Sequence, residues 1–356
     1  SGNVYVIGRE ARNDLGQSYN IWLAKYGATG MLLWSKTFNG GSNGSDQGKS
    51  IAVDGSGNIY AAGLETVTGQ NTNAWIAKYD TNGLVQWTTN YNGSASGGDG
   101  ATGIVVDGSG NAYVTGYEVG TGAENLWVRK YDTNGLVQWT TSYNGASDQN
   151  YRGYSIARDI QGNFVVAGYE TIAGQSQDIV VRKFDPSGLT LWSTSYNDAA
   201  NGTQMGFGVS VDTADNVYVT GSDGVSGQGN NLWLRKFTKD GLMLLTTTYN
   251  NAGNTDDSGN GIFVAGSAIY VTGSENRTDL GQGQNILLRK FIQNVPNAPS
   301  NISAVSRTTT TIVWSWTDNA GGYQYQEERT SVTRAMDGVL IASVSVDVSQ
   351  YTQTGL

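Results

Sequence analysis

The chain has 356 residues and a formal net charge of -9, with neither Cys nor His. These absences exclude disulfides, thiolate chemistry, Ser-His-Asp hydrolysis and imidazole-ligated zinc or haem. The acidic balance disfavours nucleic acid, because phosphate backbones are held chiefly by Lys and Arg, and no apolar run is long enough to span a bilayer. The 50 Gly, only 3 Pro and many Tyr and Trp favour an all-β chain of short strands and tight turns.

An internal repeat organises residues 1 to about 293. The motif Y-x-x-G, or a variant of it, ends at six glycines spaced by 52 to 55 residues: Gly8, Gly63, Gly116, Gly168, Gly221 and Gly273. A Lys followed by an aromatic residue recurs in step with it, at Lys25, Lys78, Lys130, Lys183, Lys236 and Lys290. A Trp completes the pattern at 34, 87, 139 and 192, with Leu245 in the fifth copy. A period of this length is typical of propellers and other repeat arrays.

Each copy predicts four short strands in chain order. In the second copy these are "SIAVD" (50–54), "NIYAAG" (58–63), "AWIAKY" (74–79) and "LVQWTTNY" (84–91). The turns "DGSG" and "DTNG" between them supply residues that tolerate positive φ and hydrogen-bond their own backbone. A lone four-stranded sheet cannot bury both faces, so stacked copies predict a β-propeller with the fourth-strand Trp buried between blades.

The first and last copies are incomplete. "SGNVYVIG" aligns with Ser56–Gly63, so the first copy lacks its first strand, and the sixth copy stops before its fourth. Either six blades close the ring with two three-stranded members, or upstream repeats complete a seventh blade. We favour the seventh blade.

The elements D-x-x-G-N-x-Y-V-x-G and K-Y-D-x-x-G-x-x-x-W resemble the bacterial β-propeller repeats of the SBBP family. The resemblance covers residues 1–293 and implies a seven-bladed propeller on a secreted protein. It implies little about activity, because propellers host many unrelated functions.

The repeat ends at the stretch "IQNVPNAPS", which holds two of the three Pro residues. We expect a linker over 294–299. Residues 300–356 resemble the first two-thirds of a fibronectin type III domain, with Trp314 or Trp316 as the core Trp of its second strand. This resemblance implies an incomplete immunoglobulin-like β-sandwich that continues beyond Leu356.

An acid lies two residues after each anchor glycine: Glu10, Glu65, Glu118, Glu170, Asp223 and Glu275. Grouped carboxylates could form a metal site, with structural Ca²⁺ the natural candidate, or a polar binding rim. The alternative, which we favour, is that each acid accepts hydrogen bonds locally. The six anchor Lys residues could serve Schiff-base chemistry or a structural role in the scaffold. Because all six occupy equivalent positions of the repeat, we favour the structural role. No other cofactor is expected.

The loops between the second and third strands vary most and carry a recurring Gln: Gln17, Gln70, Gln175, Gln228 and Gln282. Loops on a rigid scaffold commonly carry binding specificity. These amides could bind glycans, although a solvated hairpin tip explains them as well.

The sequence therefore predicts a non-enzymatic, structural or adhesive protein, extracellular or on the cell surface. Its partners would be other surface proteins, glycans or copies of itself, with neither nucleic acid nor direct membrane insertion. One alternative is a carboxylate-based glycosidase using Asp256-Asp257 or Asp148. Another is a calcium-dependent lectin-like binder.

Overall fold

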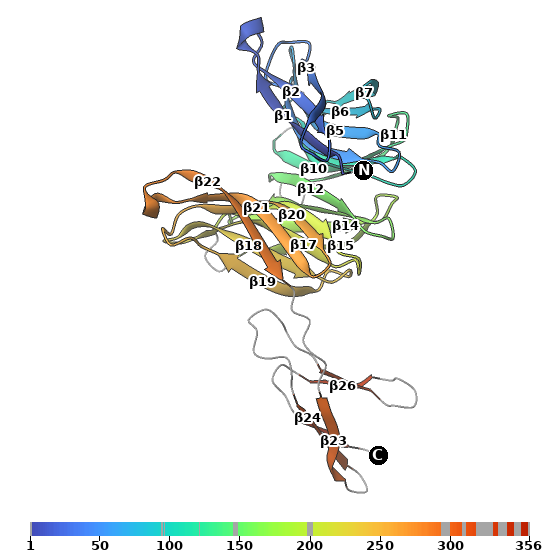
Figure 1. Cartoon of the computed structure of the whole chain (residues 1–356), viewed down its shortest axis with the longest axis vertical. Coiled ribbons are helices and arrows are strands. Elements are labelled where there is room, and N and C mark those ends of the chain that lie inside the picture. The colour runs from blue at the N-terminus through green and yellow to red at the C-terminus, as the bar shows by residue number, and fades with distance from the viewer. Residues whose placement is uncertain are drawn as a thin grey trace.

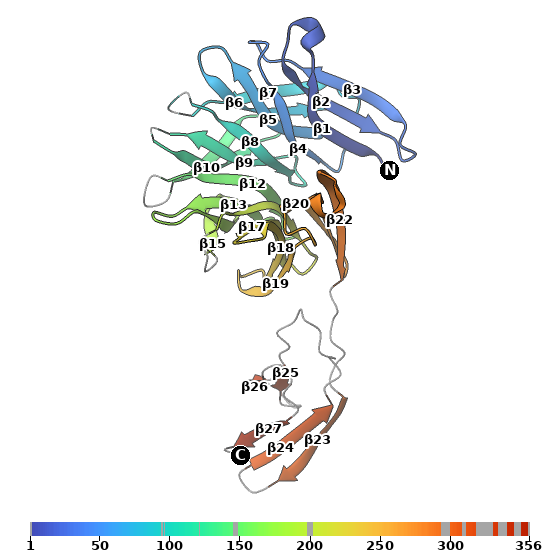
Figure 2. The same ribbon diagram turned by 90° about the vertical axis from the view of Figure 1, so that its left-hand side faces the viewer.

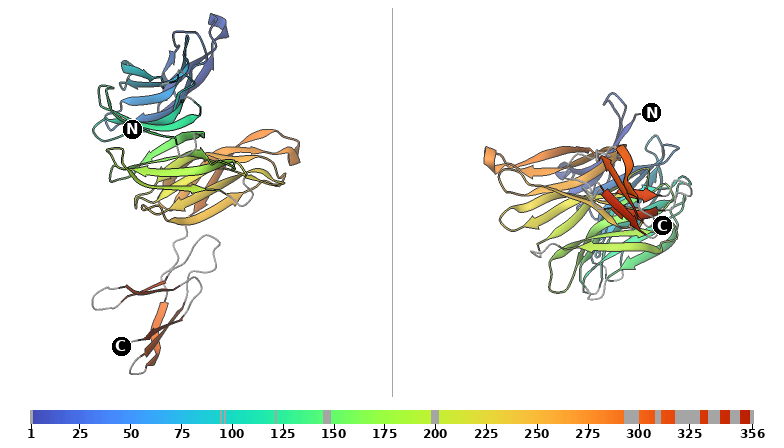
Figure 3. Two further views of the ribbon diagram at one scale, coloured as in Figure 1. Left: turned by 180° about the vertical axis from the view of Figure 1, so that it is seen from behind. Right: turned by 90° about the horizontal axis from the view of Figure 1, so that it is seen from below.

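In the computed structural model, residues 2–292 are described except 94, 96, 121, 145–148 and 198–201, together with the backbone of five strands between 300 and 354. The first of these regions is an all-β, six-bladed propeller whose antiparallel blades have three or four strands. Figure 1 and Figure 2 show the blades following one another around a common centre in chain order, from blue to orange. The same succession is seen from behind in Figure 3.

The strands of the first three blades lie in sequence order across each sheet. Blade 1 contains β1 (Val4–Ala11), β2 (Tyr19–Tyr26) and β3 (Leu32–Phe38). Blade 2 contains β4 (Gln47–Val53), β5 (Ile59–Val67), β6 (Asn71–Tyr79) and β7 (Val85–Tyr91). Blade 3 contains β8 (Gly100–Val106), β9 (Ala112–Val119), β10 (Glu124–Tyr131) and β11 (Val137–Tyr143).

The last three blades repeat this order. Blade 4 contains β12 (Tyr151–Arg158), β13 (Phe164–Thr171), β14 (Gln177–Phe184) and β15 (Thr190–Tyr196). Blade 5 contains β16 (Gln204–Val211), β17 (Val217–Val225), β18 (Gly229–Phe237) and β19 (Met243–Tyr249). Blade 6 contains β20 (Asp257–Ala265), β21 (Ala268–Asn276) and β22 (Gln284–Ile292). Two short 3-10 helices, η1 (Asn13–Leu15) and η2 (Thr278–Leu280), lie in the end blades.

The predicted turn chemistry is confirmed at the hairpin between the first and second strands of blade 2. Asp54 Oδ1 accepts hydrogen bonds from the backbone N–H groups of Ser56 and Asn58, both at 2.9 Å. Gly57 adopts a φ of +83°, a region that glycine enters without steric cost. Asp107 and Asp212 form the same pair of bonds in blades 3 and 5, so these aspartates act as turn formers.

Among the described residues, the hydrophobic core forms five clusters, one for each pair of consecutive blades. At the interface of blades 2 and 3, Tyr60 and Ile76 of one sheet pack against Val114 and Trp127 of the next. Side chains alternate along a strand, so neighbouring positions serve the interfaces on opposite sides of a blade. This is why the repeat recurs: every blade must present the same two faces.

The sequence predicted that the fourth-strand Trp is buried between blades, and this prediction is wrong in the extent of burial. Trp87 packs at the edge of the interface and is only half-buried. The deeply buried indoles are on the third strands instead, at Trp75, Trp127 and Trp233, each at most 1% exposed. The third strand lies in the interior of each four-stranded sheet, whereas the fourth strand is its outer edge.

The incomplete end blades are confirmed in the described residues, since blade 1 has no strand before β1 and blade 6 has three strands. The described propeller has six blades, and the seven-bladed assembly stays a prediction of the family resemblance.

The C-terminal region is described only at the level of its backbone strands. β23 (Ser300–Arg307) pairs with β24 (Thr311–Thr317), which pairs with β27 (Gln350–Thr354). β25 (Thr330–Thr333) and β26 (Leu340–Val344) form a separate two-stranded sheet. No sandwich is shown by these strands, while the linker at 294–299 and the Trp314 and Trp316 side chains lie outside the described residues. In the described part of the chain, no helix has the length and apolar character needed to cross a membrane.

Candidate functional site: the loop face

One end of the propeller carries the variable loops. In each antiparallel blade, the hairpin between the second and third strands lies at the same end as the connection to the next blade. We call this end the loop face. The six acids, the five Gln residues and the acids at 256 and 257 all belong to it.

Four of the six acids that follow the anchor glycines accept hydrogen bonds from neighbouring side chains. Asn90 Nδ2 donates to Glu65 Oε1 at 2.8 Å, and the Tyr249 hydroxyl donates to Glu275 at 3.1 Å. Thr37 and Tyr91 donate in the same way to Glu10 and Glu118. All four donors come from fourth strands. The acids therefore tie the outer edge of a sheet to the end of a second strand.

The remaining two acids, Glu170 and Asp223, are 8% and 7% exposed. Burial raises the pKa of Glu65, while the hydrogen bond from Asn90 opposes that rise. Within the described residues no three carboxylates come close enough together to share a metal ion. The structure thus gives four of the acids a side-chain donor and does not gather the six, which leaves a structural role as the simpler explanation.

A second set of acids lies at the start of the first strands, and the sequence analysis did not recognise it as a set. Asp99 is fully buried, and its two carboxylate oxygens accept the backbone N–H groups of Gly93 at 2.6 Å and Val119 at 2.8 Å. Asp46 accepts from Gly40 and Thr66 with the same geometry. Burial raises the pKa of both carboxyl groups, although the backbone N–H donors oppose that rise. Each carboxylate joins the connection between two blades to the end of a second strand.

The signal for these acids was present in the sequence. Asp46, Asp99 and Asp257 each lie two residues before a Gly or Ala of the first strand, and they are 53 and then about three periods apart. Tyr151 and Gln204 occupy the position in blades 4 and 5, and these exceptions hide the pattern.

Four of the five recurring Gln residues accept a hydrogen bond within their own hairpins. Gln70 Oε1 accepts from Asn73 Nδ2 at 2.7 Å, and Gln17, Gln228 and Gln282 accept from Asn20, Asn231 and Asn285 in the same way. Gln175 lies in the blade 4 hairpin, where Asp178 stands in place of the Asn. The amide oxygens are therefore used inside the hairpins, and the glycan-binding role stays a prediction.

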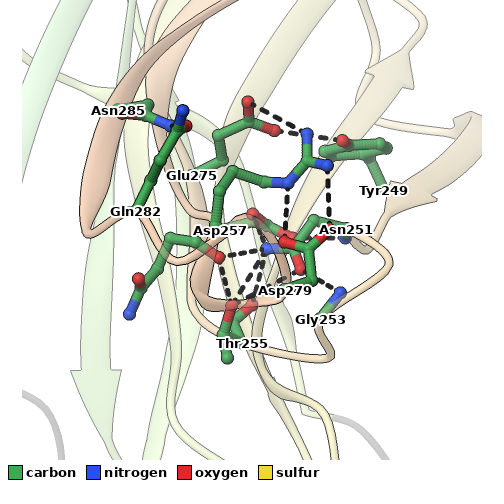
Figure 4. A network of polar contacts seen from close by, with 11 residues as sticks. Tyr249, Asn251, Gly253, Thr255, Asp257, Glu275, Asp279, Gln282 and Asn285 are labelled. Atoms are coloured by element: carbon green, nitrogen blue, oxygen red, sulfur yellow. Dashed lines mark hydrogen bonds and ion pairs between the residues drawn. The ribbon is translucent and has the colours of Figure 1, made fainter.

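Among the described residues, the two end blades alone share a hairpin with a 3-10 turn. In blade 6, the Arg277 guanidinium donates to both oxygens of Asp279 at 2.9 Å and lies 3.8 Å from Glu275. Arg277 also holds the pKa of Asp279 below its ordinary value. Figure 4 shows this cluster joined to the hydroxyl of Tyr249 and, beside it, the bonds between Asn251 and Asp257.

Blade 1 repeats the arrangement with Arg12 between Asp14 and Glu10, at 3.2 Å and 3.6 Å. In both blades a 3-10 turn follows and ends at a left-handed glycine, and the last residue of the turn is an exposed leucine. Leu15 is 57% exposed and Leu280 is 59% exposed. Ion pairs and backbone bonds thus hold an apolar side chain outward at the tip of each end-blade hairpin.

The acids considered for a glycosidase have different surroundings in the structure. Asp257 is buried, and both of its oxygens are bound by Asn251 at 2.7 Å. Asp256 is exposed and accepts the backbone N–H of Asn230 at 2.9 Å, at the rim of a shallow groove of about 390 Å³. Asp148 lies outside the described residues. The two described acids therefore point to different surroundings and serve different loops.

The anchor lysines act at the opposite end of the propeller. Lys25 Nζ and Trp34 Nε1 both donate to the carbonyl of Thr81 in the next blade, at 2.9 Å and 3.3 Å. Lys78 and Trp87 repeat this on the carbonyl of Thr133. Backbone carbonyls of the next blade therefore bind both ammonium groups, as a scaffold role requires.

Residues 34–64 match the family described as SBBP, a beta-propeller repeat. No curated protein matches the chain. Among solved structures, the chain is similar to a protein of unknown function from Dyadobacter fermentans, at 12% identity and a TM-score of 0.46, over 79% of this chain and 93% of that one. A periplasmic gluconolactonase from Pseudomonas aeruginosa matches at 12% identity and a TM-score of 0.48, over 99% and 100%. A putative exo-beta-1,3-galactanase from Bifidobacterium bifidum matches at 14% identity and a TM-score of 0.42, over 72% and 92%.

Proposed function

We propose that this chain is a non-enzymatic extracellular or cell-surface scaffold, structural or adhesive, that binds other proteins or glycans through its loop face. The observation that carries the proposal is the pair of matched end-blade hairpins. Each is held by an Arg-Asp ion pair and presents an exposed leucine, Leu15 or Leu280. Apolar side chains on pre-ordered loops lose little conformational entropy on binding.

The polar groups of the loop face support a scaffold over a catalyst. The carboxylates beside the loops accept hydrogen bonds that fix loops and strand ends, as Glu65 and Asp99 illustrate. A glycosidase needs two carboxyl groups facing one substrate across a set separation. The surroundings of Asp256 and Asp257 differ too much for that role.

The finer features of the proposal rest on resemblance. The SBBP-like repeats support an exported bacterial protein, and a fibronectin-like module at residues 300–356 would serve as a spacer. Protease accessibility on intact cells carrying the natural gene tests the location. A chain that stays protected until the cells are lysed would contradict it.

The binding role is tested with arrays of glycans and of purified extracellular proteins, probed with the whole chain. We expect the double substitution Leu15→Asp and Leu280→Asp to remove the signal. The matched control is Leu136→Asp, because Leu136 is 64% exposed at a turn on the opposite end of blade 3. Equal loss in the control would contradict recognition by the loop face.

Two further assays address the alternatives. Release of the aryl group from a panel of aryl glycosides, abolished by Asp256→Asn, would favour an enzyme. A rise in the melting temperature on adding Ca²⁺, removed by Glu118→Gln, would favour a calcium-dependent binder. We expect neither effect.

A further inference from the structure

A β-bulge recurs at one position in the first strand of every blade from the second to the sixth. In each of these strands one residue is skipped where the strand pairs with its neighbour: Lys49, Thr102, Tyr154, Phe207 and Asn260. We call these five residues the bulge ring. A bulged residue is left unpaired in the ladder, and bulges often re-aim a side chain beside a functional site.

The sequence keeps the bulge and varies the residue that the bulge displays. The skipped residue is flanked on both sides by Gly, Ala or Ser in all five copies, which read GKS, ATG, GYS, GFG and GNG. The residue in the middle changes from an ammonium group to a hydroxyl, two aromatic rings and an amide. Packing between equivalent blades would favour one residue type at this position. The variation therefore indicates that the five side chains are not needed for the fold itself.

The bulge ring surrounds the centre of the propeller. The first strands of consecutive blades lie side by side, whereas each fourth strand is the outer edge of its sheet. Members of the ring contact the next blade, since the Thr102 hydroxyl donates to the carbonyl of Gly153 at 2.5 Å. The ring centroids of Tyr154 and Phe207 are 5.2 Å apart. Lys49 and Asn260 are exposed and the other three members are half-buried, so solvent reaches the whole ring.

The bulge ring is set back from the tips of the loop-face hairpins. Gly48, beside Lys49, pairs with Gly63, and β5 continues for four more residues to Val67. Blade 5 has the same geometry. Four residues of a strand are about 13 Å long, at about 3.3 Å per residue. A flat protein surface that rests on the hairpins would miss the ring, whereas the end of a narrow chain would reach it.

Positive charge gathers on one side of the bulge ring, although the chain as a whole has a net charge of -9. Loss of hydration lowers the pKa of Lys49, and the nearby charges of Arg9 and Arg152 lower it further. Arg152 forms an ion pair with Glu124. Among the described residues, no carboxylate forms an ion pair with Lys49 or Arg9. An anion bound beside Lys49 would relieve this repulsion between like charges.

We propose that the bulge ring binds the acidic end of a glycan, a terminal sugar that carries one carboxylate. Lys49 binds the carboxylate through a charge-assisted hydrogen bond. Tyr154 and Phe207 pack against the apolar face of the sugar, and the polar side chains of Thr102 and Asn260 bond its hydroxyl groups.

The charge of the chain favours this ligand over an acidic protein. A net charge of -9 repels a large acidic partner, but one carboxylate responds mainly to cations within the Debye length of about 8 Å. The inference rests on the proposed binding of glycans by the loop face, and it names the class of glycan and the residues that bind it.

The test compares two trisaccharides that differ only in the terminal sugar, which is glucuronic acid in one and glucose in the other. Binding to the whole chain is measured by isothermal titration calorimetry. We expect the acidic trisaccharide to bind with a Kd below about 1 mM, and the neutral one to bind at least about tenfold more weakly. Raising the salt from about 0.01 M to about 1 M should remove most of this difference, because salt screens the charge of Lys49.

Three protein variants separate the roles within the ring. Lys49→Met removes the charge and keeps the length of the side chain, so it should bind the two trisaccharides equally. Phe207→Ala should weaken the binding of both, because the aromatic ring packs against either sugar. Lys36→Met is the matched control and should bind like the parent, since Lys36 is exposed on β3, the outer strand of blade 1. Equal melting temperatures would show that the variants fold.

Four results would overturn the proposal. They are no saturable binding up to about 1 mM, equal binding of the two trisaccharides by the parent, equal loss in Lys49→Met and Lys36→Met, and displacement of the acidic trisaccharide by a Glu-rich nonapeptide that binds more tightly. The last would assign the ring to a protein partner. An array signal that Leu15→Asp with Leu280→Asp removes, and that Lys49→Met leaves unchanged, would preserve the loop-face proposal in each of these cases.

Discussion

The indole ring of Trp87 in blade 2 lies directly against Gly135 in the turn between the third and fourth strands of blade 3. A Cβ atom built on Gly135 would be 2.7 Å from Cδ2 of that ring. The same relationship joins Trp34 to Gly83, Trp139 to Gly188 and Trp192 to Gly241. Each of these Trp residues thus fits a space that only glycine leaves open in the next blade.

We expect Gly135→Ala to destabilise the propeller by about 2–4 kcal/mol. Gly135 has a φ of +81°, which costs an L-residue about 1 kcal/mol, and overpacking against a fixed ring costs about 1–3 kcal/mol more. Chemical denaturation of the whole chain gives the free energy of unfolding.

The chain supplies a matched control for this prediction. Gly30 has a φ of +82° in the equivalent turn of blade 1, but a Cβ there would meet nothing within 4 Å. Gly30→Ala should therefore cost only the backbone penalty of about 1 kcal/mol. Equal costs for the two variants would show that the Trp contact contributes nothing.

We expect Trp127→Ala to cost about 3–5 kcal/mol, and Trp87→Ala to cost less. Trp127 is fully buried in the core between blades 2 and 3, whereas Trp87 is half-buried at its edge and donates one hydrogen bond to Thr133. Denaturation midpoints of the two variants, compared at one pH, test the order. A larger loss for Trp87→Ala would place the main stabilisation at the blade edges.

A buried ion pair in blade 4 gives a prediction with a pH dependence. Lys183 Nζ lies 2.9 Å from Asp159 Oδ2, and both residues are 3% exposed. We expect Asp159→Asn to cost about 3–5 kcal/mol at pH 7, because it leaves a buried ammonium group without its counter-charge. The double variant Asp159→Asn with Lys183→Met should recover part of the loss.

The sign of the pH effect follows from the carboxyl group. Burial by itself would raise the pKa of Asp159, but the hydrogen bonds from Lys183 and Asn163 outweigh it, so the pKa lies below its ordinary value of 3.8. The pair's contribution is therefore present above pH 3.8 and is lost as the pH falls below it. The parent and Asp159→Asn should converge in stability toward pH 2, and parallel curves would contradict this assignment.

The repeat made the fold predictable, because the residues that form the two packing faces of a blade and its turns recur in every copy. The Asp54 and Gly57 turn was foreseen from "DGSG", and the blade count of the described chain follows the anchor glycines.

The extent to which each Trp side chain is buried could not be predicted from the repeat. In blades 1 to 3 the sequence shows one indole in the third strand and another in the fourth, but which of them lies at a sheet edge depends on the tertiary order of strands. The stacking of Arg129, Arg182 and Arg235 on Tyr91, Tyr143 and Tyr196 of the preceding blades, at 3.1–3.6 Å from the ring centroids, was missed for the same reason. Each pair is separated by nearly forty residues of unrelated sequence.

The loop face shows the same limit. The acid two residues after each anchor glycine recurs in all six copies, so the sequence identified it. Its hydrogen-bond donor, where one is seen, is a fourth-strand residue such as Asn90, and the type of that residue differs from blade to blade. The buried Asp99 was hidden because blades 4 and 5 replace it by Tyr151 and Gln204. A repeat reveals what every copy shares, whereas these contacts vary between copies.

The last prediction concerns that buried carboxylate. Asp99→Asn keeps the size of the side chain but replaces one acceptor oxygen by an NH₂ group, which then faces the N–H of Gly93 or of Val119. One buried donor is left unsatisfied, so we expect a loss of about 1–3 kcal/mol in the free energy of unfolding at pH 7. The control is Asp240→Asn, because that carboxylate is 74% exposed and its loss should change stability by less than about 0.5 kcal/mol.

The pH response of Asp99 should be opposite to that of Asp159. Burial raises the pKa of Asp99 above its ordinary value of 3.8, so the folded state holds its proton more tightly than the unfolded state does. The contribution of this group to stability is largest below pH 3.8 and declines as the pH rises through the raised value. Subtracting the stability of Asp99→Asn from that of the parent across pH 3 to 7 isolates this term. A difference that grows with pH would show that the carboxylate is favoured in its ionised form by its two backbone donors.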